Sequence, residues 1–535
     1  MSELISLQAP KGTTIIWNEP FKPSRRILDL FQEIHKGKNA LEASDLVPIL
    51  RDDWSLFCHF LSITKPAIKS ILVPVDRVRQ GDMATKKDLY DFLQNNPSIG
   101  RVILTSQDDE DNEAVEDVLD AICKSYTIKT LEFRRLHVKD PLPATFRHLQ
   151  HAFALRTVST MLLDKATEDS ILQALAKCPK MNQCKIQGGP NSLRAPLHIE
   201  SSLNYLSSLV LEQHVWSTAS FQALGEHVAR EDCSRLCELE IKAFNSHGNP
   251  DRTSDPIPMH FLESLARSSR LERIHLENLV WSSIPPENMV LLLRSPKIRS
   301  LYLHSLSDEQ VQSLLHTKCH ELKEMLVTVD SGISIETLRM AITWFESNSS
   351  LEKFGIECLG VPSLTWTRSS LGHICCHCEA SFCPVDWELM ATWMGDNSSE
   401  MQWTWSLLSM KEDDVLGICN ILSRTKCRVT RLDLFWSSMF STACVDFLVS
   451  TLQATYSLLH VNVHEGFAVF AVLSDNLTSL QQAADCIVAR NRIRSLIQSN
   501  VTSAVWPKVL SKETNLSAVF MAMECGEIYN FGCKH

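Results

Sequence analysis

Apolar residues recur along most of the chain in one short pattern, hydrophobic at positions one, four and six and mostly polar between them. Most copies start about 24 to 35 residues apart, a period typical of units that combine one strand with one helix or turn. Weaker copies start at Leu155 and at Gln402. The clear copies are Ile68-Ile71-Val73, Ile99-Val102-Leu104, Ile128-Leu131-Phe133, Met181-Cys184-Ile186, Leu206-Leu209-Leu211, Leu236-Leu239-Ile241, Leu271-Ile274-Leu276, Ile298-Leu301-Leu303, Leu322-Met325-Val327, Leu351-Phe354-Ile356, Val429-Leu432-Leu434 and Leu458-Val461-Val463.

Segments with helical periodicity separate these copies. Apolar residues recur there at every third or fourth position, as in EAVEDVLDAICKS, FQALGEHVARE and IETLRMAITWFES. Ser307 followed by Gln310 forms a capping-box sequence, which favours a helix start. Strands joined by helical crossovers pair in parallel. The sequence therefore predicts an α/β fold with one long parallel sheet and helices on its outer side.

Residues 65–467 resemble the ribonuclease-inhibitor-like class of leucine-rich repeat proteins. The stretches SRLERIHLENL (269–279), SPKIRSLYLHSL (295–306) and SSLEKFGIECL (349–359) carry the resemblance. It implies a horseshoe-shaped solenoid of about 13 to 15 repeats, with strands on the concave face and helices on the convex face. The Asn or Cys expected after each strand is present at Asn278 but is replaced by Ser305 and by Cys358-Leu359 in other copies, so we expect irregular turns. The spacing between residues 360 and 400 is irregular as well.

Both ends of such a stack need a cap, because terminal repeats would otherwise expose apolar faces. Residues 1–64 contain a strand-like GTTIIW and two helical segments, and we interpret them as the N-terminal cap. An F-box is the alternative, although its opening Leu-Pro is absent. Residues 468–535 are interpreted as a C-terminal helical cap. They resemble the end of leucine-rich repeat proteins of diatoms, with Asn491-Arg492, Trp506-Pro507, Val509-Leu510 and Val519-Phe520 as the matching positions.

Composition and charge limit the compartment, partners and cofactors that we expect for the protein. The chain has 535 residues, a formal net charge of −11 and 18 cysteines. Its first residues show no basic segment before an apolar run, and no apolar run is long enough for a membrane span. We therefore expect an intracellular protein, cytoplasmic or nuclear, with reduced cysteines. We also expect a monomer. The acidic charge and the lack of an evident basic stripe argue against nucleic acid. We also expect no cofactor, because no nucleotide-binding or zincin motif is present.

The stretch HICCHCEASFC holds the only dense group of metal-ligating residue types. The candidate ligands are His373, Cys375, His377, Cys378 and Cys383. Leu371, Ile374 and Cys376 fit the repeat, which would place His373, Cys375 and His377 on one face of a strand. A structural zinc site usually has two ligand pairs, and a second pair is missing here. We therefore favour a strand with reduced thiols over a metal site.

The predicted function is that of a non-enzymatic interaction scaffold that binds a protein partner on the concave face. Positions three, five and seven of each copy point outward there, and their mixed charges and aromatic rings suit protein recognition. Two alternatives are a ubiquitin-ligase substrate receptor recruited through residues 1–64, and a GTPase-activating protein of the same fold. The candidate partner-binding residues are Glu240, Lys242, Arg273, His275, Glu277, Tyr302, His304, Lys353, Glu357, Arg431, Asp433, Phe435, Asn462 and His464.

Overall fold

The chain forms two compact units, Met1–Ile284 and Pro285–His535. The predicted C-terminal cap, 468–535, lies outside the described part of the chain apart from four residues. The computed structural model describes residues 5–8, 14–17, 24–46, 51–106, 109–110, 112–139, 141, 143–175, 177–178, 180–188, 206–230, 235–244, 254–319, 321–330, 332–358, 361–369, 374–380, 386–396, 402–407, 412–423, 429–436, 442–455, 458, 460–465, 484–485 and 487–488.

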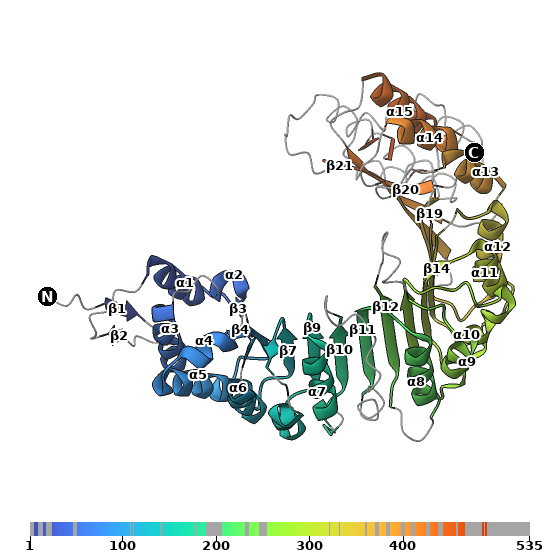
Figure 1. Ribbon diagram of the computed structural model, residues 1–535. Coiled ribbons are helices and arrows are strands. Elements are labelled where there is room, and N and C mark those ends of the chain that lie inside the picture. The colour runs from blue at the N-terminus through green and yellow to red at the C-terminus, as the bar shows by residue number, and fades with distance from the viewer. Residues whose placement is uncertain are drawn as a thin grey trace, which may run out of the picture. The chain divides into compact units, whose positions relative to one another are not determined.

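A parallel sheet runs through the first unit, with its strands in sequence order (Figure 1). Each strand pairs with the next in an unbroken register over most of its length. The strands are β3 (Ala40–Leu41), β4 (Ser70–Pro74), β5 (Arg101–Thr105), β7 (Thr130–Arg134), β9 (Thr157–Met161), β10 (Gln183–Gln187), β11 (Ser208–His214), β12 (Glu238–Ala243) and β13 (Arg273–Glu277).

The one-four-six pattern forms the core of this unit, as predicted. The fourth positions of neighbouring copies, such as Leu209, Leu239 and Ile274, pair across β11, β12 and β13 and are buried. The sixth positions, such as Ile241 and Leu276, form a second buried row beside them. Full burial of an aliphatic side chain contributes about 1.5–3 kcal/mol, so each repeat adds several kcal/mol through these positions.

Helices cover one side of this sheet (Figure 1). Neighbouring helices pack against each other, α3 with α5, α5 with α6, and α8 with α9. The elements of this layer are α3 (Arg51–Thr64), α4 (Val75–Gln80), α5 (Met83–Asn95), α6 (Asn112–Lys124), the 3₁₀ helix η1 (Pro143–His151), α7 (Lys165–Leu175), α8 (Thr218–Ala229) and α9 (Met259–Arg267). Two short strands, β6 (Asp109–Glu110) and β8 (His137–Val138), pair in parallel outside the main sheet.

The N-terminal segment, residues 1–64, precedes the main sheet and also provides its first strand, β3. The strand expected in GTTIIW is β2 (Thr14–Trp17), which pairs antiparallel with β1 (Ile5–Gln8). The helices α1 (Arg25–His35) and α2 (Ala43–Leu46) follow, and β3 between them pairs in parallel with β4. Ser24 caps α1 by accepting a hydrogen bond from the backbone N–H of Ile27.

The second unit repeats the same alternation of strands and helices. Its helices pack consecutively from α11 to α15. No helix in the described part of the chain is long and apolar enough to cross a bilayer. The elements are η4 (Pro286–Asn288), α10 (Val290–Arg294), β14 (Ser300–Leu306), α11 (Asp308–Leu315), β15 (Glu324–Val329), α12 (Ile335–Ser347), β16 (Lys353–Cys358), β17 (Val361–Arg368), β18 (Ile374–Ala380), α13 (Trp387–Asp396), β19 (Gln402–Leu407), α14 (Glu412–Leu422), β20 (Val429–Trp436), α15 (Thr442–Ala454) and β21 (His460–Glu465).

One strand corrects the prediction of an entirely parallel sheet. Strand β17 pairs antiparallel with both β16 and β18, whereas the other pairs from β14 to β21 are parallel. Only two residues separate Cys358 from Val361, and so short a connection permits a hairpin but no parallel crossover. The buried Trp366 of β17 stacks on Phe354 of β16, with ring centroids 5.3 Å apart. The extra strand thereby shares the core of the repeats beside it.

The turns after the strands are more regular than their sequence suggests. Arg135, Leu162, Gln213, Asn278 and Ser305 all have positive φ angles, between 51° and 69°. Arg135, Leu162 and Asn278 directly follow a strand, and Gln213 and Ser305 are the penultimate residues of β11 and β14, so five different residue types adopt one left-handed conformation near strand ends. The backbone N–H of Arg135 donates to Met161 across the sheet, and that of Leu162 donates to Gln187. The expectation of irregular turns is therefore wrong at Arg135, Leu162 and Asn278, whereas the strand register does shift at Gln213 and Ser305.

Candidate interaction surface

Rows of polar side chains cover the outward face of the first unit's sheet from β7 onward. Parallel register places equivalent residues side by side, so Lys185, Val210, Glu240 and His275 form a continuous row across β10 to β13. A second row contains Glu212, Lys242 and Glu277 in direct register. Glu240, Lys242, Arg273, His275 and Glu277, all predicted to point outward, do so while their strand neighbours are buried.

A network of ion pairs links these rows. The Lys242 ammonium lies 2.7 Å from Glu240, 3.5 Å from Glu212 and 4.0 Å from Glu277. Lys185 extends the network to β10 through an ion pair of 2.8 Å with Glu212. One lysine thus lies among three carboxylates, and its hydrogen bond to Glu240 raises the pKa of Lys242. Lys242 therefore stays charged under all ordinary conditions.

His275 lies between two of these carboxylates. Its Nδ1 is 3.4 Å from Glu240 and its Nε2 is 3.2 Å from Glu277. Burial lowers the pKa of His275, the two glutamates act in the opposite direction, and the net shift is downward. The ring therefore lies between two carboxylates of neighbouring positions, one on β12 and one on β13. Arg273 lies at the border of the network and pairs with Glu238 at 2.9 Å.

A second charged cluster on this face was missed by the sequence reasoning. The carboxylate of Glu132 on β7 is almost buried and contacts both Arg101 of β5 and Arg134 of its own strand, the latter at 2.6 Å. Burial raises the pKa of Glu132, but the hydrogen bonds from the two arginines outweigh burial and the net pKa is lowered. Reading positions three, five and seven in the copies that start at Ile99 and Ile128 would have identified all three residues.

The candidate residues at the start of the second unit form a less charged surface. Tyr302 and His304 of β14 are half-buried on the outward side, and the His304 ring nitrogen Nδ1 lies 2.7 Å from the hydroxyl of Ser305. Lys353 and Glu357 of β16 are exposed. The Ser363 hydroxyl of β17 donates to Glu357 at 3.4 Å. These candidates therefore lie on the predicted side but do not form an ion-pair network with one another.

The candidates on β20 and β21 surround one carboxylate. Arg431 donates to Asp433 at 2.9 Å, and Asn462 donates to the other oxygen of Asp433 at 2.5 Å. Asp433 is buried, in contrast to the expectation of an exposed residue, because these two neighbours cover it. Phe435 and His464 pair in backbone register, and their side chains lie outside the described part of the structure.

The cysteine-rich strand places the candidate metal ligands on opposite faces. Cys376 is buried as predicted, and Cys378 is buried too, whereas Cys375 and His377 are half-exposed. Alternation along β18 therefore separates the Cys375–Cys378 pair, so these two thiols do not share a binding face. His373 and Cys383 lie outside the described residues. Within the described part of the chain, no three histidine, cysteine or acidic side chains are grouped closely enough to hold a metal ion.

Comparison with known proteins gives no family assignment. No family model matches the chain, and no curated protein matches it either. Among solved structures, one match is a chain in the crystal structure of the Rad7 and Elc1 complex in yeast. The TM-score is 0.32 with 12% sequence identity, and the alignment covers 63% of this chain and 91% of that chain. A likeness at this level has no bearing on function.

Proposed function

We propose that the chain is a non-enzymatic scaffold of the leucine-rich repeat type, which binds a protein partner through the outward face of its sheet. The proposal depends on the charged network of β10 to β13. There, cross-strand pairing holds side chains of both signs in fixed positions over four neighbouring strands. The ribonuclease-inhibitor-like class and a concave binding face are part of the same proposal.

Fixed charges of this kind favour selective binding. Side chains that already have defined positions lose less conformational entropy when a partner binds. Complementary charges raise the association rate and select the partner and its orientation. The half-buried His275 and the stem of Lys242 add apolar contact area between the charges. A partner with a pattern of opposite charges would therefore replace some of the internal pairs with pairs across the interface.

The test uses the full-length tagged protein to capture partners from a lysate of the source cells. Lys242→Ala combined with Arg273→Ala removes two cations from the face. Lys87→Ala combined with Arg267→Ala is the matched control, because it removes two exposed cations from helices α5 and α9. Loss of one well-placed contact costs about 1–3 kcal/mol, so we expect recovery of the partner to fall at least about fivefold for the face variant alone.

The circular dichroism spectrum and melting temperature of both variants serve as folding controls. Equal recovery by the two variants would show that the network takes no part in binding. Loss of the partner in the helix variant alone would place the binding surface on the opposite side of the sheet.

A further inference from the structure

The loops that precede the strands of the first unit carry charge of one sign. Residues 65–69, 96–100, 125–129, 152–156 and 176–182 precede β4, β5, β7, β9 and β10, and they contain six lysines and arginines but no aspartate or glutamate. The whole chain has a net charge of −11, so this bias runs against its composition. The segments that follow the same strands do contain acidic residues, as in VDRVRQGD at 75–82 and SQDDED at 106–111.

Backbone hydrogen bonds hold these loops side by side. The carbonyl of Lys69 accepts from the N–H of Gly100 at 2.9 Å, and that of Gly100 accepts from Lys129 at 2.9 Å. The carbonyl of Lys129 then accepts from Arg156 at 2.8 Å. The residues directly before successive strands therefore lie side by side, separated by the distance between neighbouring strands. Lys69, Lys129 and Arg156 are all exposed along this edge.

An exposed aromatic pair lies in the same loops. Tyr126 is 76% exposed and Phe153 is 49% exposed, and their rings stack with centroids 5.0 Å apart. Each ring lies three residues before a cation of the edge, Lys129 or Arg156 respectively. The ammonium of Lys180 lies 5.9 Å from the centre of the Phe153 ring. Large apolar rings with this exposure, bordered by cations, are typical of binding surfaces.

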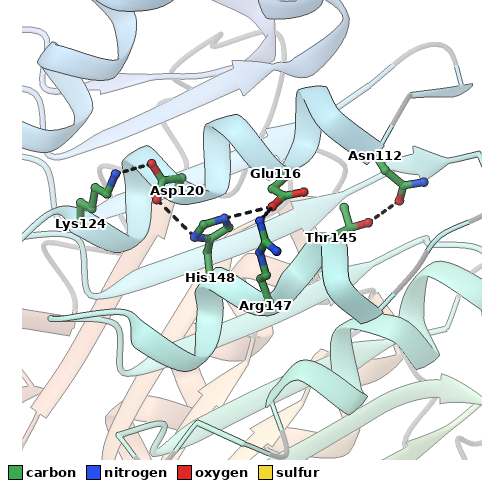
Figure 2. Close-up of polar contacts among 7 residues, drawn as sticks. All are labelled: Asn112, Glu116, Asp120, Lys124, Thr145, Arg147 and His148. Atoms are coloured by element: carbon green, nitrogen blue, oxygen red, sulfur yellow. Dashed lines mark hydrogen bonds and ion pairs between the residues drawn. The ribbon is translucent and has the colours of Figure 1, made fainter.

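Two acidic side chains of the neighbouring helix α6 have partners on α6 and η1. Figure 2 shows that Asp120 of α6 contacts Lys124 and His148, while Glu116 contacts His148 and Arg147. These carboxylates are therefore engaged by side chains other than Lys129 and Arg156. Within the described part of the chain, no ion pair involves Lys69, Lys129, Arg156 or Lys180. Among the described residues, these four cations therefore have no ion-pair partner.

We propose that this edge, formed by Lys69, Lys129, Arg156 and Lys180 with the rings of Tyr126 and Phe153, binds an acidic segment of another protein. The five strands from β4 to β10 span about 19 Å at a strand spacing of about 4.8 Å, which matches about six residues of an extended peptide. Aspartates and glutamates of the segment pair with the cations, and one large apolar side chain packs on the aromatic pair. The surface is separate from the sheet face and goes beyond the function proposed above.

The edge also corrects the expectation that the chain lacks a basic stripe. A peptide fits it better than nucleic acid for two reasons. The overall charge of −11 repels a long polyanion, whereas a short segment meets only the local cations. The length of about 19 Å corresponds to only about three nucleotides, fewer than single-strand binding sites usually cover.

The test measures fluorescence anisotropy of a labelled peptide of about ten residues, alternating Asp and Glu around one central Phe. A second peptide replaces the acids with Asn and Gln, and a third replaces Phe with Ser. The protein variants are Lys129→Glu with Arg156→Glu, and Tyr126→Ser with Phe153→Ser. The matched control is Lys86→Glu with Lys87→Glu on α5, which makes the same change in net charge away from the edge.

We expect the edge charge reversal to weaken binding at least about tenfold at low salt, and the α5 control to change it by less than about twofold. Replacing Phe in the peptide should weaken binding to the wild-type protein but not to the Tyr126→Ser/Phe153→Ser variant, because the two changes remove the same contact. Three results would overturn the proposal. They are no binding of the acidic peptide, equal loss in the α5 control, and tighter binding of an oligonucleotide than of the peptide.

Discussion

Helix α14 passes close to the start of α13, and Gly417 is the residue that permits this approach. A Cβ atom added to Gly417 would lie 2.1 Å from Cγ of Trp387 and 2.6 Å from its Cβ. The Trp387 indole N–H also donates to Asp414 on α14 at 2.9 Å. The ring therefore lies beside Gly417 and is joined to α14 by a hydrogen bond.

Gly417→Ala sets two effects against each other. Alanine gains about 1 kcal/mol over glycine in a helix interior. Carbon atoms without a bond between them prefer separations of about 3.5–4.0 Å, so the new methyl group overlaps Trp387 by more than about 1 Å. Rotation of the ring gives no relief, because the Trp387 Cβ moves only with its backbone. Overpacking costs about 1–3 kcal/mol and the lost hydrogen bond about 1 kcal/mol more, so we expect a net destabilisation of about 1–3 kcal/mol.

Hydrogen exchange of the native protein, followed by mass spectrometry, measures this effect locally, because repeat proteins open in segments. We expect amides in α13 and α14 to exchange about tenfold faster for each 1.4 kcal/mol lost. Gly225→Ala on α8 is the control. There the added Cβ would meet Ser264 at 3.2 Å and Phe261 at 3.3 Å, which small shifts relieve. Unchanged or slower exchange in α13 and α14 of Gly417→Ala would refute the reasoning.

Three further predictions concern acid stability, a turn and the thiols. Burial lowers the pKa of His214 to about 4, so stability is complete above about pH 6.5 and decreases by on the order of 3 kcal/mol as the pH falls to 4. Thermal unfolding of His214→Gln should depend less steeply on pH in this interval, and an unchanged slope would contradict the assignment. Leu162 has a φ of 57°, a conformation that costs a residue of this type about 1–2 kcal/mol. We expect Leu162→Asn to raise the melting temperature, and a decrease would show that the apolar contacts of Leu162 outweigh its strain. Burial raises the pKa of Cys184 to about 12, whereas Cys375 is half-exposed. N-ethylmaleimide should therefore label Cys375 of the native protein well before Cys184, as peptide mapping would show, and equal rates would be evidence against the described burial.

The core of the sheet was predictable because it depends on local spacing alone. Alternation along a strand requires Leu239 and Ile241 to share a face, whatever the rest of the chain does. Strand β17 was not predictable from the repeat, since its direction depends on the two-residue link after Cys358 and not on its apolar positions. The left-handed turns escaped prediction for another reason. Leu162 and Arg135 adopt a conformation that tertiary context imposes against their own preference.

The sequence predicted which residues lie on the candidate surface, but not which of them form ion pairs with one another. Reading alternate positions identified Lys242 and His275 as outward-facing, and the structure places both there. The pairing of Lys242 with Glu212 and of His275 with Glu240 depends on the register between strands about 30 residues apart, which no single copy of the pattern contains. The basic edge was missed for the same reason, because Lys129 and Arg156 are distant in sequence and adjacent only after folding.

Parallel register aligns the few exposed charged residues of each repeat into a continuous charged surface. One exposed lysine or arginine in a loop means little, but backbone bonds between Gly100, Lys129 and Arg156 align such residues into a stripe. Exposed pairs contribute only about 0–1 kcal/mol each, so charges on the sheet face and the edge add little to stability compared with the buried rows. Substitution of these charges should therefore change binding without changing the melting temperature appreciably. This separation between the residues that fold the chain and those that recognise a partner is what allows both surfaces to be tested by charge reversal.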